Sequence, residues 1–87
     1  MFEVEWLRSA FDELTALWAA SDPAEREAMA AAIQRLDPQL RSDPLSLGES
    51  RPEGRRIVFE HPLVVTYRVE RVGSVVVVLH VWRSDRP

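Results

Sequence analysis

The sequence predicts an α+β fold in which a helical hairpin covers one face of a mainly antiparallel, four-stranded sheet. The expected order is strand, helix, helix, strand, strand, strand. Apolar residues recur at helical spacing over the first half of the chain and alternate with a period of two over the second half. The chain has 87 residues, which suits one domain, and we expect that domain to span residues 1–87.

The first half of the chain carries one strand signal and two helix signals. Residues 2–6 alternate apolar and acidic side chains, as in a half-buried strand. Ser9 is the expected N-cap of the first helix, with Asp12 completing a capping box. Asp22 is the expected N-cap of the second helix, with Pro23 at its first position. The apolar sides of the two helices consist of Phe11, Leu14, Leu17, Trp18, Met29, Ile33, Leu36 and Leu40.

Two details of this half bear on packing. Pro38 interrupts the second helical pattern and has no N–H to donate, so we expect a kink or break near Asp37. Trp6 and Trp18 are expected in the core. The connection between the two helices is very short, which predicts that they run antiparallel.

The second half reads as three strands after a loop at residues 42–54. Valine-rich runs at 55–59, 63–69 and 74–82 alternate with the strand period. The last run is apolar on both of its faces, which is typical of a central strand that is covered on both sides.

Strict alternation along these strands assigns each residue to a face. The side expected to lie under the helices contains Ile57, Phe59, Leu63, Val65, Tyr67 and Val69. The side expected to face outward contains Arg56, Val58, Val64, Thr66, Arg68, Val76, Val78, His80 and Trp82. Because helices can cover one face only, the apolar outer face predicts a docked partner: another protein, a second copy in a homodimer, or a nucleic acid with exposed bases.

Composition excludes several classes of protein. There are no cysteines, so disulfides and thiolate metal sites are excluded. No apolar run approaches the length of a membrane span, the run at residues 75–79 is only as long as a strand, and the N-terminus has no signal-peptide pattern. We therefore expect a cytoplasmic protein with no membrane association.

Charge is distributed unevenly along the chain. Residues 1–50 hold four arginines and ten acids, residues 51–87 hold seven arginines and four acids, and lysine does not occur. A basic second half favours contact with phosphate or with an acidic partner, although a small domain can also neutralise such charges internally.

Several segments of the second half, taken in order, resemble one family. They are Asp43-Pro44-Leu45-Ser46-Leu47-Gly48-Glu49-Ser50, Gly54-Arg55-Arg56, Val65-Thr66-Tyr67-Arg68-Val69 and Val77-Val78-Leu79-His80-Val81-Trp82-Arg83. With the N-terminal strand and the helical pair, they resemble the RelE/ParE superfamily of bacterial toxin–antitoxin systems over nearly the whole chain. The resemblance implies a compact toxin whose sheet is wrapped by a cognate antitoxin, and we expect that antitoxin to bind at Val58, Val64, Val76, Val78 and Trp82.

The same resemblance implies three alternative functions. RelE-like members cleave mRNA on the ribosome without a metal or another cofactor, by attack of a ribose 2′-hydroxyl on the neighbouring phosphate. ParE-like members instead poison DNA gyrase and have no hydrolytic site. A degenerate member would survive as a partner-binding module without toxicity.

An RNA-cleaving version needs a proton-transfer group and cations for the phosphate. Arginine binds phosphate well but does not shuttle protons, so His80 is the best proton-transfer candidate. Expected catalytic residues are His80, Arg56, Arg68 and Arg83. Expected phosphate-binding residues are Arg55, Arg56, Arg68, Arg83 and Arg86.

Each of these candidates also has an ordinary structural reading. His80 can be a strand histidine with common hydrogen bonds, and Arg56 and Arg68 can pair with Glu60 or Glu70. His61, which precedes Pro62 in a turn, is expected to be solvated, and Tyr67 is expected in the core. Val64 stands where RelE-like nucleases usually have a basic residue, which weighs against the enzyme.

Overall fold

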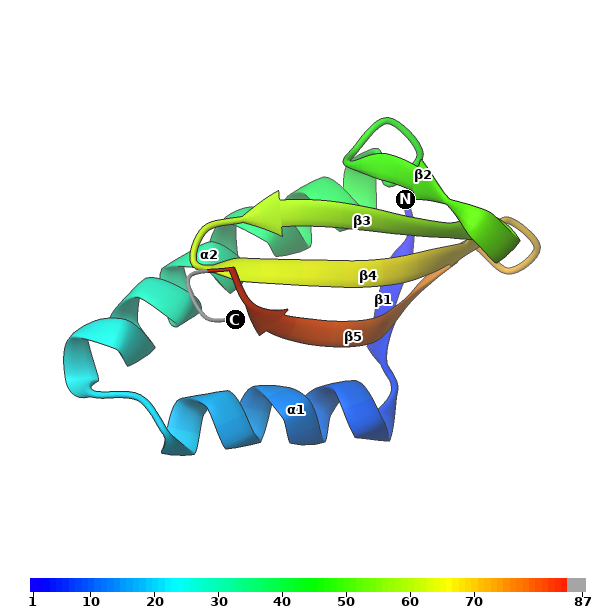
Figure 1. The fold of residues 1–87 in the computed structure, drawn as a ribbon. Helices are drawn as coiled ribbons and strands as arrows, with labels where there is room; N and C mark the ends of the chain where they lie inside the picture. Colours follow the sequence, from blue (N-terminus) through cyan, green and yellow to red (C-terminus); the bar gives the residue numbers. More distant parts are fainter. Residues whose placement is uncertain (85–87) are drawn as a thin grey trace.

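The computed structural model describes residues 1–84, which form one mixed sheet and two helices (Figure 1). The strands are β1 (Glu3–Trp6), β2 (Glu49–Arg51), β3 (Arg55–Glu60), β4 (Leu63–Glu70) and β5 (Val75–Arg83). The helices are α1 (Arg8–Ala19) and α2 (Pro23–Ser42), and a 3-10 turn covers Pro52–Gly54.

The strand order in the sheet is β1-β5-β4-β3-β2. β1 runs parallel to β5 and the remaining neighbours are antiparallel. The predicted α+β class and the central position of the last strand are confirmed. The predicted strand number is one too low, because Glu49–Arg51, inside the expected loop, pairs with β3.

The two helices begin differently. α2 begins as predicted: the Asp22 carboxylate accepts from the Glu25 N–H and the Glu25 carboxylate accepts from the Asp22 N–H, each at 2.8 Å. The prediction for α1 is wrong, because the N-cap position is taken by Leu7, which has no polar side-chain atom. Asp12 instead accepts from the Arg8 Nε at 3.1 Å.

Of the kink or break predicted near Asp37, the break does not occur, since α2 continues through Pro38 to Ser42. Leu36 and Leu40, on either side of Pro38 in the sequence, are 3% and 2% exposed. Burial of these two leucines holds the last turns of the helix against the core, and it outweighs the hydrogen bond that proline cannot make.

The helices diverge from their short connection, as Figure 1 shows, and the expected hairpin is open. α2 packs on β1 and β3, whereas α1 packs along β5. β1 pairs with the first part of β5 and α1 lies along the rest of β5. α2 covers one face of the sheet, called the inner face below.

The core lies between α2 and this inner face. Its buried residues are Ala10, Met29, Ala32, Leu36, Leu40, Val58, Leu63, Val65, Tyr67, Val76, Val78 and Val81. Trp6 packs against this cluster, as expected, but Trp18 is 42% exposed on α1 and the prediction that it is buried is wrong.

Two structural features change the predicted faces. The turn between β3 and β4 pairs Glu60 with Leu63 and Val58 with Val65, so Val58 faces the core while Ile57 and Phe59 face outward. In β5, Thr66 pairs with His80 but Tyr67 pairs with Val78, which leaves Leu79 as an extra residue in a β-bulge. The bulge reverses the alternation, so Val76 and Val78 point into the core while His80 and Trp82 lie outward.

Candidate functional site

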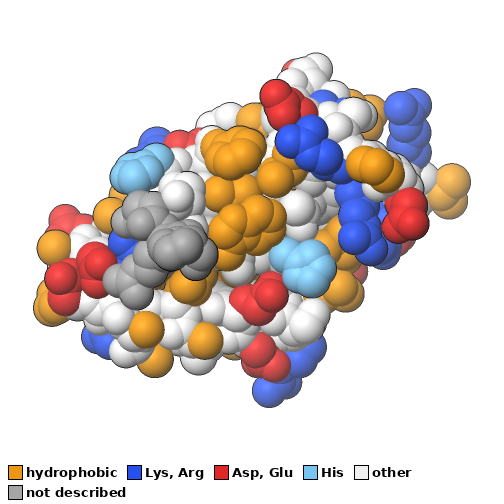
Figure 2. All heavy atoms as spheres, viewed as in Figure 1, with side chains coloured by type: hydrophobic (Ala, Val, Ile, Leu, Met, Phe, Trp, Pro, Cys, Tyr) orange, Lys and Arg blue, Asp and Glu red, His pale blue; other side chains and the backbone are white. Residues whose placement is uncertain are grey.

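A concavity on the outer face of the sheet brings together two of the predicted catalytic or phosphate-binding residues, His80 and Arg55, with the arginine Arg51. It has a volume of about 460 Å³ and is lined by Arg51, Pro52, Glu53, Arg55, Ile57, Thr66, His80 and Trp82. The space-filling view in Figure 2 shows hydrophobic side chains gathered in the middle of this face, with arginines collected towards its β2 end.

The register of three neighbouring strands builds the floor of this concavity. Ile57 on β3 pairs with Thr66 on β4, and Thr66 pairs with His80 on β5. The Thr66 hydroxyl is buried and has no hydrogen-bond partner among residues 1–84. Because the bulge at Leu79 turns His80 outward, one apolar, one hydroxyl and one imidazole side chain lie in a row across the sheet.

The His80 side chain contacts Glu13 of α1. Its Nδ1 lies 3.4 Å from the Glu13 Oε2, and the other carboxylate oxygen accepts from the Val81 N–H at 3.3 Å. The imidazole is about half exposed. His80 therefore has one ring nitrogen near a carboxylate and an exposed ring beside the concavity, an arrangement suited to proton transfer.

Three exposed arginines surround or border this site. Arg51 is 3.1 Å from the Glu49 carboxylate and Arg55 is 4.0 Å from that of Glu53. Arg68 lies opposite Arg55 on the neighbouring strand and makes a 2.9 Å ion pair with Glu70 of its own strand, not the cross-strand pair that the structural reading expected. Exposed pairs of this kind are worth about 0–1 kcal/mol, so a phosphate can replace the carboxylate at low cost.

Arg55 also lines a second concavity at the same end of the molecule. This one has a volume of about 280 Å³ and is lined by Leu45, Ser50, Gly54, Arg55, Arg56, Val69 and Arg71. A polyanion that crosses Arg55 would meet cationic groups in both concavities.

Arg56 does not face outward as predicted, because it pairs with the inward-facing Tyr67. Its guanidinium donates to the Leu47 and Gly48 carbonyls at 3.1 and 3.3 Å and to the Ser50 hydroxyl at 3.3 Å. These bonds hold the loop that follows α2 against β3. Arg56 therefore stabilises the position of this loop and does not point into the concavity.

Arg83, expected to be catalytic and to bind phosphate, is instead a buried residue at the end of β5. Its side chain is only 5% exposed and lies 3.0 Å from the Glu25 carboxylate and 3.3 Å from the Ser21 hydroxyl. Leu63 and Arg83 pair at the end of β4 and β5, which turns Arg83 towards the connection between the helices. Arg86 lies outside the described residues.

Tyr67 is fully buried, as predicted. Its hydroxyl oxygen lies 2.7 Å from the Pro44 carbonyl and 2.6 Å from the Leu47 carbonyl, and its one proton is shared between these acceptors. Burial raises the pKa of Tyr67 above its ordinary value of 10.0, an effect that the neighbouring Arg56 partly opposes. Tyr67 therefore anchors a loop and stays protonated.

The expected antitoxin surface is only partly on the outer face. Val64 and Trp82 are paired there, but Val58, Val76 and Val78 belong to the core, for the reasons of register and bulge given above. Phe59, which was expected inside, is 62% exposed beside Val64, and Trp82 is 41% exposed. The apolar part of the outer face thus centres on these two aromatic rings.

Sequence reasoning missed several residues of this region. Glu13 lies 67 positions from His80, and its contribution becomes visible only when α1 is placed along β5. Arg51 and Glu53 lie in the segment interpreted as a loop. A proline and a glycine around Glu53 are the signal that a tight turn brings these charges to the sheet edge.

A second apolar surface lies on α1. Phe11 and Trp18 are 54% and 42% exposed and line a shallow groove with Leu14 and Thr15. Arg26 lies 5.8 Å from the centre of the Trp18 ring and donates to the Trp18 carbonyl at 2.8 Å. This helix face is thus exposed and available for contact.

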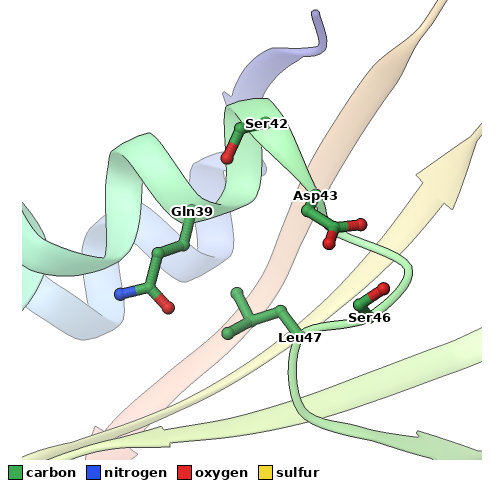
Figure 3. Close-up of a pocket in the computed structure, with 5 residues that line it drawn as sticks. All are labelled: Gln39, Ser42, Asp43, Ser46 and Leu47. Atoms are coloured by element: carbon green, nitrogen blue, oxygen red, sulfur yellow. The ribbon is translucent and has the colours of Figure 1, made fainter.

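A further pocket lies where α2 ends (Figure 3). It has a volume of about 270 Å³ and is lined by Gln39, Ser42, Asp43, Ser46 and Leu47. A single carboxylate among neutral side chains does not form a proton-transfer pair.

Within residues 1–84 we find no cluster of three or more histidine, cysteine or acidic residues that could hold a metal ion. Over the same residues, neither helix is long and apolar enough to cross a membrane.

Comparison with known proteins gives a clear result for the fold. No family model and no curated protein matches the sequence. A chain of the chromosomal ParDE toxin–antitoxin system of P. aeruginosa matches with a TM-score of 0.75 and 21% identity, covering 95% of this chain and 96% of that one. A chain of the RelBE2 toxin–antitoxin complex of Mycobacterium tuberculosis matches with a TM-score of 0.72 and 22% identity, covering 94% and 96%.

The isolated E. coli RelE toxin matches with a TM-score of 0.65 and 17% identity, over 100% of this chain and 88% of that one. The chain therefore has the fold shared by RelE and ParE toxins.

Proposed function

We propose that this chain is the toxin of a bacterial toxin–antitoxin pair, acting in the cytoplasm and neutralised by a cognate antitoxin. The observation that carries the proposal is the fold, which corresponds over nearly its full length to chains of toxin–antitoxin systems from three bacteria. The exposed aromatic and basic face supports it, since such a face suits both a protein partner and an RNA target.

The mode of action we propose is cleavage of mRNA on the ribosome. His80 takes the proton of a ribose 2′-hydroxyl, the 2′-oxygen bonds to the adjacent phosphorus, and the P–O5′ bond breaks to leave a 2′,3′-cyclic phosphate. The departing 5′-oxygen takes a proton from water. Arg55 and Arg68 neutralise charge that develops on the phosphate oxygens.

A second candidate, non-enzymatic inhibition of a target such as gyrase, is favoured by the placement of two other arginines. Arg56 and Arg83 are engaged in hydrogen bonds and ion pairs of the fold, and Val64 offers no charge on the outer face. Fewer cations are thus left at the concavity than the nuclease hypothesis first assumed. The exposed aromatic side of α1 would then contact the target.

The antitoxin we propose covers Trp82 and Phe59 on the outer face. Trp82 lines the concavity together with His80, and Phe59 lies two residues from Ile57 of its floor, so a bound segment would also exclude RNA from the site. Neutralisation then follows from occlusion. A homodimer through the same rings is the competing use of this surface.

Expression from a tightly repressed promoter tests the proposal. We expect induction of the chain alone to stop growth and to produce cuts in translated mRNA that primer extension detects. His80→Asn should abolish the cuts, since general-base catalysis contributes about 100-fold or more. His61→Asn, at the exposed histidine of the β3–β4 turn, is the matched control and should stay toxic.

Each outcome separates the candidates. Growth arrest with intact mRNA and lost DNA supercoiling would replace mRNA cleavage by gyrase inhibition. Normal growth after strong induction of the folded chain would overturn the toxin proposal itself.

A further inference from the structure

We infer that Glu13 on α1 is the positioning residue for His80: it fixes the neutral imidazole with its proton on Nδ1 and leaves Nε2 as the proton acceptor at the concavity. The inference about the ring rests on geometry alone. Its consequence for activity rests on the proposed function.

The first observation is that both oxygens of one carboxylate are used on adjacent residues. The Glu13 Oε1 accepts from the Val81 N–H at 3.3 Å, and Oε2 lies 3.4 Å from the His80 Nδ1. The backbone contact fixes the carboxylate relative to β5. The second oxygen is thereby placed beside the imidazole of the preceding residue.

The second observation explains why a helix supplies this group. β1 pairs with β5 only as far as Trp6 opposite Val78, and the Leu7 N–H donates to the Val78 carbonyl. Beyond that point β5 has an open edge, and α1 runs along it. Glu13 satisfies the Val81 N–H that a longer β1 would have bonded.

The third step is chemical. An ionised carboxylate can only accept hydrogen bonds, and neutral imidazole has one N–H and one acceptor nitrogen. The ring nitrogen beside Glu13 must therefore carry the proton, which leaves the lone pair on Nε2. The other charged groups at the concavity, Glu53, Arg51 and Arg55, come from the β2–β3 segment.

This arrangement gives α1 a function that packing alone does not require. Glu13 is about 41% exposed, so neither of its contacts is forced by burial. A glutamine in its place can keep the contact to Val81, but its amide can also donate, so it no longer dictates the proton position on His80.

The test is the tautomeric state of His80, measured by nitrogen-15 NMR on full-length protein made by cell-free synthesis. A His61→Asn background leaves His80 as the single histidine. On the high-pH plateau we expect the Nδ1–H form in this background and a shift towards the Nε2–H form with Glu13→Gln. Glu27→Gln, at an exposed position of α2, is the matched control and should leave the spectrum unchanged.

The Nε2–H form in the background protein overturns the inference without any Glu13 variant, so its falsification does not depend on whether that variant folds. An unchanged tautomer in folded Glu13→Gln overturns it as well. In cells we expect Glu13→Gln to lower mRNA cleavage at least about tenfold while the fold is kept. If the tautomer shifts but growth arrest persists unchanged, the positioning of His80 stands and the proposed catalysis by His80 fails.

Discussion

The two faces of the sheet use the same side chain for opposite purposes. Arg55 and Arg56 are neighbours in the sequence, yet Arg56 turns inward and bonds the Leu47 and Gly48 carbonyls while Arg55 lies at the outer concavity with a carboxylate 4.0 Å away. Arg83 repeats the inward case at the other end of the sheet. An arginine that faces inward thus stabilises the fold through hydrogen bonds and ion pairs, whereas one that faces outward remains able to bind a phosphate.

The largest loss of stability is expected at Gly48, whose carbonyl accepts a hydrogen bond from the inward-facing Arg56. Gly48 has φ +69°, and a Cβ added there would collide with the Ile57 carbonyl. Gly48→Ala should lower the free energy of unfolding by about 3 kcal/mol or more, because strain and a backbone clash add. Denaturant unfolding measures it.

Gly73→Ala is the matched control for this substitution. Its φ is +87°, but an added Cβ would stand clear of other atoms of residues 1–84. The cost should be about 1 kcal/mol, from the left-handed conformation alone. Equal losses for the two glycines would contradict the close approach of the loop to β3.

Next in size is the inward arginine of β5. Arg83→Met removes the cation from Glu25 and the donor from Ser21 while it keeps most of the side-chain volume. Loss of one partner of a buried pair should cost about 3 kcal/mol. If the unfolding midpoint of Arg83→Met equals that of the native chain, Arg83 does not stabilise the fold through Glu25 and Ser21.

A smaller effect is expected at Tyr67. Tyr67→Phe leaves the Pro44 and Leu47 carbonyls without their shared donor and should cost about 1–2 kcal/mol at neutral pH.

The same residue should make stability depend on alkaline pH. Burial raises the pKa of Tyr67 in the folded state, so above about pH 10 the unfolded chain loses a proton that the folded chain keeps. Stability is therefore full below this pH and falls as pH rises. The chain has one tyrosine and no cysteine, so the phenolate absorbance reports on Tyr67 alone. Tyr67→Phe should lack this part of the alkaline loss, and ordinary titration of Tyr67 in the folded protein would refute its burial.

The smallest effect on stability is expected for the outward arginine. Arg55→Ala removes one exposed pair with Glu53 and should change the free energy of unfolding by no more than about 0.5 kcal/mol. Growth inhibition should nevertheless weaken in the expression assay. A large loss of stability for Arg55→Ala would contradict the claim that only the inward-facing arginines stabilise the fold.

Much of the fold could be predicted because it follows from local chemistry. The capping box at Asp22, the apolar stripe of α2 and the alternation in β4 each depend on neighbouring residues. The candidate site could be predicted only in outline: His80 and Trp82 were assigned to the outer face correctly, whereas Val76 and Val78 were assigned there wrongly. Alternation cannot anticipate a bulge, because an extra residue in β5 is defined only by its pairing with β4.

The sequence by itself determined the fold class, the burial of Tyr67 and the surplus of arginine in the second half. The tertiary structure decided which arginines are exposed and able to bind a phosphate, and which residue contacts the Nδ1 of His80. The physical reason is distance along the chain: Glu13 and His80 are 67 residues apart, and Arg83 and Ser21 are 62 apart. Contacts of that separation arise from the placement of α1 and α2 against the sheet, which no local pattern of residues encodes.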